Sequence, residues 1–102
     1  MEFELIKCKD APSYLNRRDV IFVDLREPEQ YSEYHLPGAY NFPYEYLEAW
    51  ENRLPRGRKI IFYCEHGNLS LMAAKRISRR GYQVAALIGG VSCFLERNTK
   101  IR

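Results

Sequence analysis

The stretch from Lys59 to Tyr82, KIIFYCEHGNLSLMAAKRISRRGY, constrains the fold more than any other part of the sequence. It opens with a continuous apolar run, residues 60–63, whose β-branched and aromatic side chains are typical of a strand buried on both faces. A helical pattern follows, in which apolar positions recur every three or four residues: Leu69, Met72, Ala73 and Ile77. Gly81 is a natural helix stop. We therefore expect a buried strand that leads directly into a helix.

Cys64 lies between that strand and that helix, which is a good position for a nucleophile. Unpaired N–H groups at a helix start favour an anion, so they favour the thiolate over the thiol. The amides expected to surround the sulfur belong to the next six residues: Glu65, His66, Gly67, Asn68, Leu69 and Ser70. Gly67 can adopt a backbone conformation that other residues resist. The alternative is that Cys64 is a small buried hydrophobic residue that ends a strand.

A second apolar run, residues 20–23, ends at Asp24-Leu25-Arg26. Because ligands gather at the carboxyl ends of parallel strands, Asp24 and Arg26 should lie at the same sheet edge as Cys64. Arg26 could supply a charge to the substrate. We favour a structural role instead, in which Asp24, Arg26 and His35 form a hydrogen-bonded brace at the strand end.

Strands that alternate with helices along the chain predict an α/β fold. The expected strands are residues 4–7, 20–23, 40–42, 60–63 and 84–88, and the expected helical segments are residues 11–16, 27–30 onward, 44–53, 69–80 and 91–97. Asp10 is the expected N-cap of the first helix. An apolar stripe is expected on the helix of residues 44–53 and just beyond it: Tyr46, Leu47, Trp50 and Leu54. The resulting architecture is a three-layer domain, with an open parallel sheet between helices on both faces.

Composition narrows the function classes. The chain has 102 residues, 46% of them hydrophobic, which suits one compact domain. A net charge of +3 with interleaved signs gives no nucleic-acid surface, and no apolar run reaches membrane-spanning length. The cysteines, Cys8, Cys64 and Cys93, form no disulfide framework or metal-ligand spacing, so we expect a reducing, cytoplasmic setting without metal or cofactor. Cys8 is expected to be structural and Cys93 a buried filler.

The loop Cys64-x-x-Gly67, followed by Ser70, resembles the active loop of rhodanese-type sulfurtransferases. Other pieces resemble the family's signatures in the same order: DLRE at residues 24–27, YSEYHLPGA at 31–39, GY at 81–82 and LIGG at 87–90. The resemblance implies a single rhodanese-like domain over residues 1–102, with about five strands. It also implies that Cys64 carries a persulfide between a donor, either thiosulfate or a persulfide or polysulfide, and a thiol acceptor. The protein is expected to be a monomer or a weak homodimer.

This sequence departs from the family pattern at several positions. Many rhodaneses carry a basic residue directly after the cysteine or an arginine at the place of Leu69, and often tryptophans after the two glycines. Here Glu65, Leu69, Val91 and Phe94 stand at those places. His66 is the loop side chain that can carry positive charge, in part, at neutral pH. Anionic donors such as thiosulfate are therefore expected to be less favoured.

Two other functions remain alternatives. One is a binding or regulatory module that kept the fold and lost the chemistry, although such modules usually lack the cysteine. The other is a cysteine phosphatase or arsenate reductase, which needs an arginine six residues after the cysteine to clamp an oxyanion. That place holds Ser70, and the first arginine after the loop is Arg76. The sequence thus argues against phosphatase chemistry.

Overall fold

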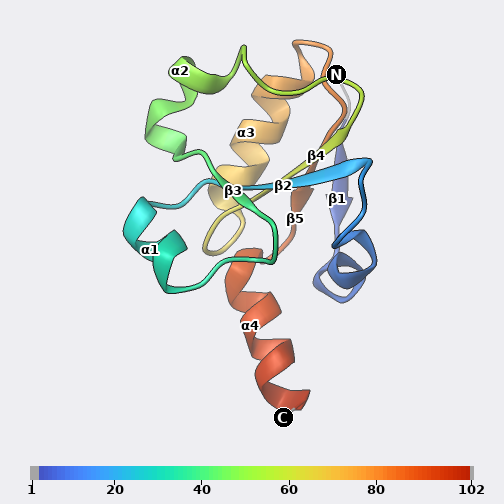
Figure 1. Ribbon diagram of the computed structural model, residues 1–102, viewed down its shortest axis with the longest axis vertical. Coiled ribbons are helices and arrows are strands. Elements are labelled where there is room, and N and C mark those ends of the chain that lie inside the picture. The colour runs from blue at the N-terminus through green and yellow to red at the C-terminus, as the bar shows by residue number, and fades with distance from the viewer. Residues whose placement is uncertain (1–2, 102) are drawn as a thin grey trace.

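The computed structural model describes residues 3–101, with side chains described up to Leu95. Its centre is a parallel five-stranded sheet in the order β1-β5-β4-β2-β3 (Figure 1). The strands are β1 (Glu4–Ile6), β2 (Val20–Asp24), β3 (Tyr40–Asn41), β4 (Lys59–Tyr63) and β5 (Val84–Leu87). The predicted α/β fold with five strands is confirmed.

Helices cover both faces of this sheet (Figure 1). They are η1 (Cys8–Tyr14, a 3₁₀ helix), α1 (Pro28–Glu33), η2 (Tyr44–Tyr46, also 3₁₀), α2 (Leu47–Trp50), α3 (Asn68–Ser78) and α4 (Gly90–Ile101). One core cluster joins α2 and α3 to the sheet through residues such as Trp50, Phe62 and Ile77. On the other face, Ala11 of η1 and Val91 and Phe94 of α4 pack against the opposite side chains of the strands.

The strand order places a topological switch between β2 and β4. From β2 the chain moves outward to β3, and it then returns to the other side of β2 to form β4 and β5. Val23 is paired with Phe62, and Asp24 with Tyr63, so the two strands end at the same level. Loops that leave such a point diverge and open a crevice at the carboxyl edge of the sheet. The segments that follow are Leu25–Arg26 and the Cys64 loop.

Several predicted helices differ from those observed. The first is a 3₁₀ helix that begins at Cys8, with Lys7 rather than Asp10 at its N-cap position, and Pro12 lies within it. The predicted helix over residues 44–53 is a 3₁₀ turn followed by the single turn of α2. The expected stripe there is partly wrong, since Tyr46 is exposed while Leu47, Trp50 and Leu54 are buried. The last helix, α4, is longer than the predicted residues 91–97.

The predicted apolar face of α3 is also wrong in part. Met72 is 53% exposed, whereas the buried positions are mostly small: Ser70, Ala73, Ala74, Ile77 and Ser78. These positions are spaced three and four residues apart and share one face of the helix. Small side chains on that face place the α3 backbone close to the sheet, so hydrophobicity alone was a poor guide to its orientation.

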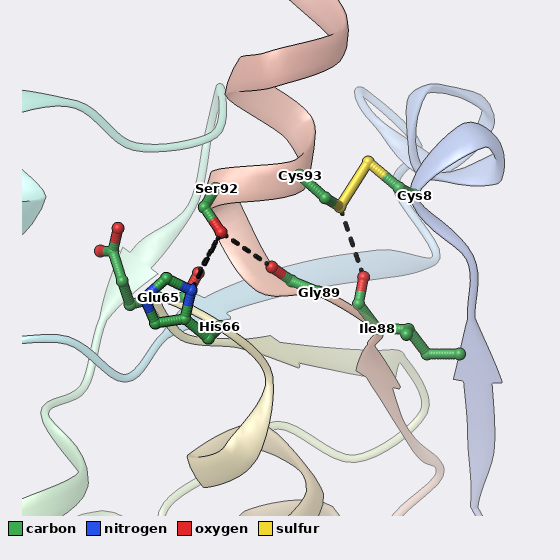
Figure 2. Close-up of a disulfide and its surroundings, with 7 residues drawn as sticks. All are labelled: Cys8, Glu65, His66, Ile88, Gly89, Ser92 and Cys93. Carbon is green, nitrogen blue, oxygen red and sulfur yellow. Dashed lines mark hydrogen bonds between the residues drawn. A yellow bond between two sulfur atoms is a disulfide. The ribbon is translucent and has the colours of Figure 1, made fainter.

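The expectation that the cysteines form no disulfide is wrong. Cys8 in η1 is bonded to Cys93 in α4, across a sequence separation of 85 residues (Figure 2). Both residues are partly exposed, so Cys93 is not the buried filler that the sequence predicts. Cys64 is the free cysteine of the chain, and it is buried. Among the described residues, no helix is both long and apolar enough to cross a membrane.

Candidate functional site

Cys64 follows β4 directly and lies at the switch between β2 and β4. Its exposed fraction is 3%, and its Sγ accepts a hydrogen bond from the Gly67 N–H at 3.1 Å. Gly67 is the residue before α3, so the sulfur lies at the amino end of that helix. A backbone N–H and a helix N-terminus both stabilise negative charge. The predicted position of the cysteine, between a buried strand and a helix, is found in the structure.

Gly67 has a φ of +111°, which a residue with a side chain rarely adopts. A Cβ at this position would also lie 3.1 Å from the Gly89 nitrogen, so the loop passes close to the backbone after β5. The turn is closed by Ser70, whose hydroxyl donates to the Gly67 carbonyl at 2.9 Å. Of the six amides predicted to surround the sulfur, residues 65–70, that of Gly67 bonds to it in the structure.

The first turn of α4 holds the other side of the loop. The Val91 N–H donates to the Cys64 carbonyl at 2.8 Å, and the Ser92 N–H donates to the Glu65 carbonyl at 3.2 Å. The Ser92 hydroxyl also donates to the Glu65 carbonyl at 3.0 Å, and its oxygen lies 3.2 Å from the His66 Nδ1 (Figure 2). A Cβ on Gly90 would lie 2.6 Å from the carbonyl carbon of Glu65. The second glycine of LIGG therefore permits this close contact.

Ser92 is a site residue that the sequence analysis missed. Ser92 follows the glycine pair and Val91 directly. The one available signal in the sequence was that it is a polar residue in a buried segment. The next residue, Cys93, carries the disulfide to η1. Two consecutive residues of α4 therefore support the Cys64 loop, through Ser92, and attach α4 covalently to η1, through Cys93 (Figure 2).

Asp24 and Arg26 form a buried pair beside the loop. The Arg26 Nε donates to one Asp24 oxygen at 3.0 Å and the Nη2 donates to the other at 2.8 Å, while the Asp24 carboxylate also accepts the Arg26 backbone N–H. The same guanidinium donates to the Tyr34 carbonyl, and its Nη1 lies 3.4 Å from the Glu65 Oε1. This arrangement fits the predicted brace better than a free substrate-binding charge.

His35 has different partners. Its Nδ1 lies 2.8 Å from the Tyr31 carbonyl oxygen, and its ring stacks on the Tyr31 ring with centroids 3.8 Å apart. It therefore supports the end of α1, rather than bonding to Asp24 or Arg26 as the predicted brace requires. Nor does the structure give it a bond to Cys64.

The sequence predicts Tyr63 to be a buried strand residue, and its hydroxyl also supports the site. The Tyr63 Oη accepts the Leu36 N–H at 3.0 Å, and the side chain is fully buried. Burial raises the pKa of Tyr63 above its ordinary value of 10.0. The phenol is therefore neutral at physiological pH and acts as a fixed hydrogen-bonding group at the end of β4.

A cavity of about 380 Å³ lies over Cys64. Its apolar lining includes Leu25, Pro43 and Leu69, and its polar and charged lining includes Arg26, Glu27, Gln30, Tyr44, Glu45, Glu65, His66 and Asn68. The volume is in the range of small-molecule sites. Of the aromatic residues near the third strand, Tyr44 lines this cavity, whereas Phe42 and Trp50 pack together against the core. A nucleophile at a small pocket beside an anion-stabilising amide can perform group transfer through the sulfur.

Comparison with known proteins finds relatives for most of the chain. The sequence model of the family described as the rhodanese-like domain matches residues 8–97. A thiosulfate sulfurtransferase, GlpE of Coxiella burnetii, is 26% identical over 91 residues, which cover 88% of this chain and 85% of that protein.

Among solved structures, a rhodanese-related protein of Thermoplasma volcanium has a TM-score of 0.86 at 24% identity, with 93% of each chain covered, and this likeness shows the fold. A protein of Rhodopseudomonas palustris described as a possible tyrosine phosphatase has a TM-score of 0.85 at 26% identity. That match covers 94% of this chain and 82% of the other.

Proposed function

Because the chain belongs to the rhodanese-like domain family, we propose that it is a sulfurtransferase whose Cys64 carries the transferred sulfur. The observation that carries the proposal is the position of the Cys64 Sγ: it lies at a small pocket, at the start of α3, and accepts the Gly67 N–H. The backbone N–H and the helix start are groups that stabilise negative charge on the sulfur, and the thiolate is the form that attacks sulfur.

The reaction has two displacements. In the first, the Cys64 thiolate attacks the outer sulfur of the donor, the donor S–S bond breaks, and the rest of the donor leaves with the bonding electron pair. The product is a Cys64 persulfide anion. In the second, an acceptor thiolate (or cyanide in vitro) attacks the outer sulfur, and the Cys64 thiolate is restored. The amides of residues 65–70 are the groups that we assign to stabilise the larger persulfide anion.

The side chains of the pocket favour a persulfide or polysulfide donor over thiosulfate. Arg26 is the permanently cationic residue in the lining, and its guanidinium is engaged by Asp24 and the Tyr34 carbonyl. Glu65, the residue after the nucleophile, adds a negative charge to the same pocket. A dianion such as thiosulfate therefore gains little from these side chains.

Intact mass spectrometry after incubation of the reduced protein with thiosulfate, and separately with polysulfide, tests the proposal. We expect one added sulfur atom on the wild type, removable by cyanide or a thiol, and none on a Cys64→Ser variant. Polysulfide is expected to load the protein faster than thiosulfate. If neither donor adds sulfur to the wild type, the proposal is wrong and a non-catalytic binding module becomes the better description.

The phosphatase alternative has little support from the loop. Ser70 occupies the place six residues after Cys64, and its buried hydroxyl bonds to the Gly67 carbonyl instead of facing an oxyanion. No guanidinium of α3 bonds to the loop among the described residues; Arg76 pairs with Glu51. Hydrolysis of p-nitrophenyl phosphate above the rate of Cys64→Ser would favour this alternative.

We further propose that residues 1–102 act as one domain, as a monomer or weak homodimer, on a small sulfur donor and a thiol acceptor in the cytoplasm. No nucleic-acid or membrane partner is part of the proposal. Disulfides in that compartment are usually transient, so the Cys8–Cys93 bond would exist there together with its dithiol form.

A further inference from the structure

The pocket over Cys64 carries an excess of negative side chains. Glu27, Glu45 and Glu65 all line it, and they come from three separate segments: the N-cap of α1, η2 and the loop after β4. Glu27 and Glu45 are exposed, and the side chain of Glu65 is 41% exposed. All three belong to the solvent-facing part of the site, whereas Cys64 is buried.

The cationic groups of the lining do not offset these carboxylates. Arg26 is 7% exposed and forms its two shortest carboxylate contacts with Asp24, which is fully buried. The contact between the Arg26 Nη1 and Glu65 is longer, at 3.4 Å. The remaining basic side chain, His66, is exposed and its Nδ1 faces the Ser92 hydroxyl. The charge of Arg26 is therefore matched by Asp24, and the charge of the glutamates remains.

The pocket thus combines two electrostatic environments. At the sulfur, the Gly67 N–H and the start of α3 stabilise an anion. Toward solvent, the glutamates attract a cation and repel a second anion. A ligand that suits both has a sulfur anion at one end and a positive charge at the other. Apolar lining from Leu25, Pro43 and Leu69 accommodates the short carbon chain between them.

We propose that this pocket selects small aminothiols as sulfur acceptors, with Glu27 and Glu45 as specificity-determining residues. The inference rests on the proposed function, because the aminothiolate attacks the outer sulfur of the Cys64 persulfide. A bond forms between the acceptor sulfur and the outer sulfur, the bond from the outer sulfur to the Cys64 Sγ breaks, and Cys64 leaves as the thiolate. The ammonium group takes no part in the bond changes; it lies near the carboxylates and lowers the energy of the encounter.

Single-turnover discharge of the loaded protein tests this. Cys64 is first sulfurated with polysulfide, excess donor is removed, and loss of the added sulfur is followed by mass spectrometry with three thiols of similar size. These are cysteamine (cationic), 2-mercaptoethanol (neutral) and 3-mercaptopropionate (anionic), each compared at equal thiolate concentration. Because thiolates differ in intrinsic nucleophilicity, each rate is divided by the rate of the same thiolate with a small-molecule disulfide. At low salt we expect this normalised rate to be about tenfold higher for cysteamine than for 3-mercaptopropionate.

A doubly substituted variant, Glu27→Gln with Glu45→Gln, separates the pocket's effect from the intrinsic reactivity of each thiol. Glutamine at residue 27 keeps an oxygen that can accept the amide hydrogen bond at the start of α1. The ratio of wild-type to variant rates should be above one for cysteamine, near one for 2-mercaptoethanol and below one for 3-mercaptopropionate. Glu33→Gln, which removes an exposed charge from α1 outside the pocket lining, is the matched control and should give ratios near one for all three.

Added salt should bring the normalised wild-type rates for the three thiols together, because it screens exposed charges. Equal normalised rates for the three thiols in the wild type at low salt would overturn the inference, and so would an unchanged preference in the double variant. Either result leaves the proposed function intact, since the persulfide would still form and discharge. Failure of the wild type to take up sulfur would instead remove the proposed function and this inference with it.

Discussion

Two clusters of ion pairs stabilise different regions of the molecule, and they differ mainly in burial. At the end of β2, Asp24 is fully buried and Arg26 is almost so. Beyond α2, Glu51 is buried but its partners on and just after α3, Arg76 and Arg80, are 44% and 41% exposed. Both clusters hold a carboxylate in bidentate contact with an arginine.

The comparison shows that similar bonds have different consequences. Removing one partner from the Asp24–Arg26 pair leaves a charge that water cannot reach, whereas Arg76 and Arg80 are exposed enough to be solvated when Glu51 is neutralised. Position differs too: Arg26 lines the pocket over Cys64, and Glu51 does not. The first cluster should therefore affect stability and sulfur transfer together, and the second stability alone.

The largest effect is expected for Arg26→Leu. It leaves the buried Asp24 carboxylate without its guanidinium, so the free energy of unfolding should fall by about 3–5 kcal/mol. Sulfur loading of Cys64 should slow as well, because the Glu65 side chain loses a contact. Urea denaturation and mass spectrometry measure the two effects. Arg26→Lys keeps the charge but lacks the planar guanidinium, so its unfolding free energy and loading rate should lie between those of the wild type and Arg26→Leu. A loss below about 1 kcal/mol would show that the pair is not what stabilises this region.

Glu51→Gln should have a smaller effect. The change removes charge-assisted bonds to Arg76 and Arg80 but leaves both arginines in contact with water, so a loss of about 1 kcal/mol is expected. Sulfur loading should match that of the wild type. Slower loading in this variant, at a temperature where it is fully folded, would contradict the proposed separation between the two clusters.

Acid should remove the contribution of Glu51. Its hydrogen bonds with Arg76, followed by the charges of Arg76 and Arg80, lower the pKa of Glu51 below its ordinary value of 4.5. A carboxyl whose pKa is lowered by folding stabilises the protein above its unfolded pKa, and this stabilisation is lost as the pH falls through the folded pKa. The difference in unfolding free energy between wild type and Glu51→Gln should thus shrink between about pH 5 and pH 2. A difference that stays constant over this range would argue against ionic pairing.

Salt should have the smallest effect on the unfolding free energy, and this effect should again differ between the two ion-pair clusters. About 1 M NaCl screens exposed charges strongly, so the stability difference between wild type and Glu51→Gln should decrease by a few tenths of a kcal/mol. The difference between wild type and Arg26→Leu should change less, because that pair is buried. Denaturation by urea at low and high salt provides the test. Equal salt dependence in both variants would mean that burial does not distinguish the clusters.

Much of the site region was predictable because its signals are local. The apolar run before Cys64, the glycine after it and the helical spacing beyond are all contained within about twenty residues. The same holds for β2, whose run ends at Asp24 as predicted. The parallel pairing that brings these segments together then follows from the alternation of strands and helices.

What failed depends on contacts between distant segments. The link between Cys8 and Cys93 joins residues whose neighbours in sequence give no indication of each other. Met72 faces solvent because the small side chains of Ala73 and Ala74, on the other face of the helix, pack closely against the sheet. Ser92 supports the loop through its position in the fold, and its local sequence marks it only as a polar residue in a buried segment.

The disulfide also determines how the molecule would respond to a pulling force. α4 projects away from the sheet beyond its first turns (Figure 1), and the bond from Cys93 to Cys8 joins it to η1, the segment that follows the edge strand β1. Tension applied at opposite ends of the chain would pass from β1 through the disulfide into α4. The covalent path would bypass residues 9–92, with the Cys64 pocket among them, and these residues would feel the tension only through contacts such as the β1–β5 pairing. Once the bond is reduced, the same tension would act on β2, β4 and β5, and the mechanical resistance would then come from the sheet.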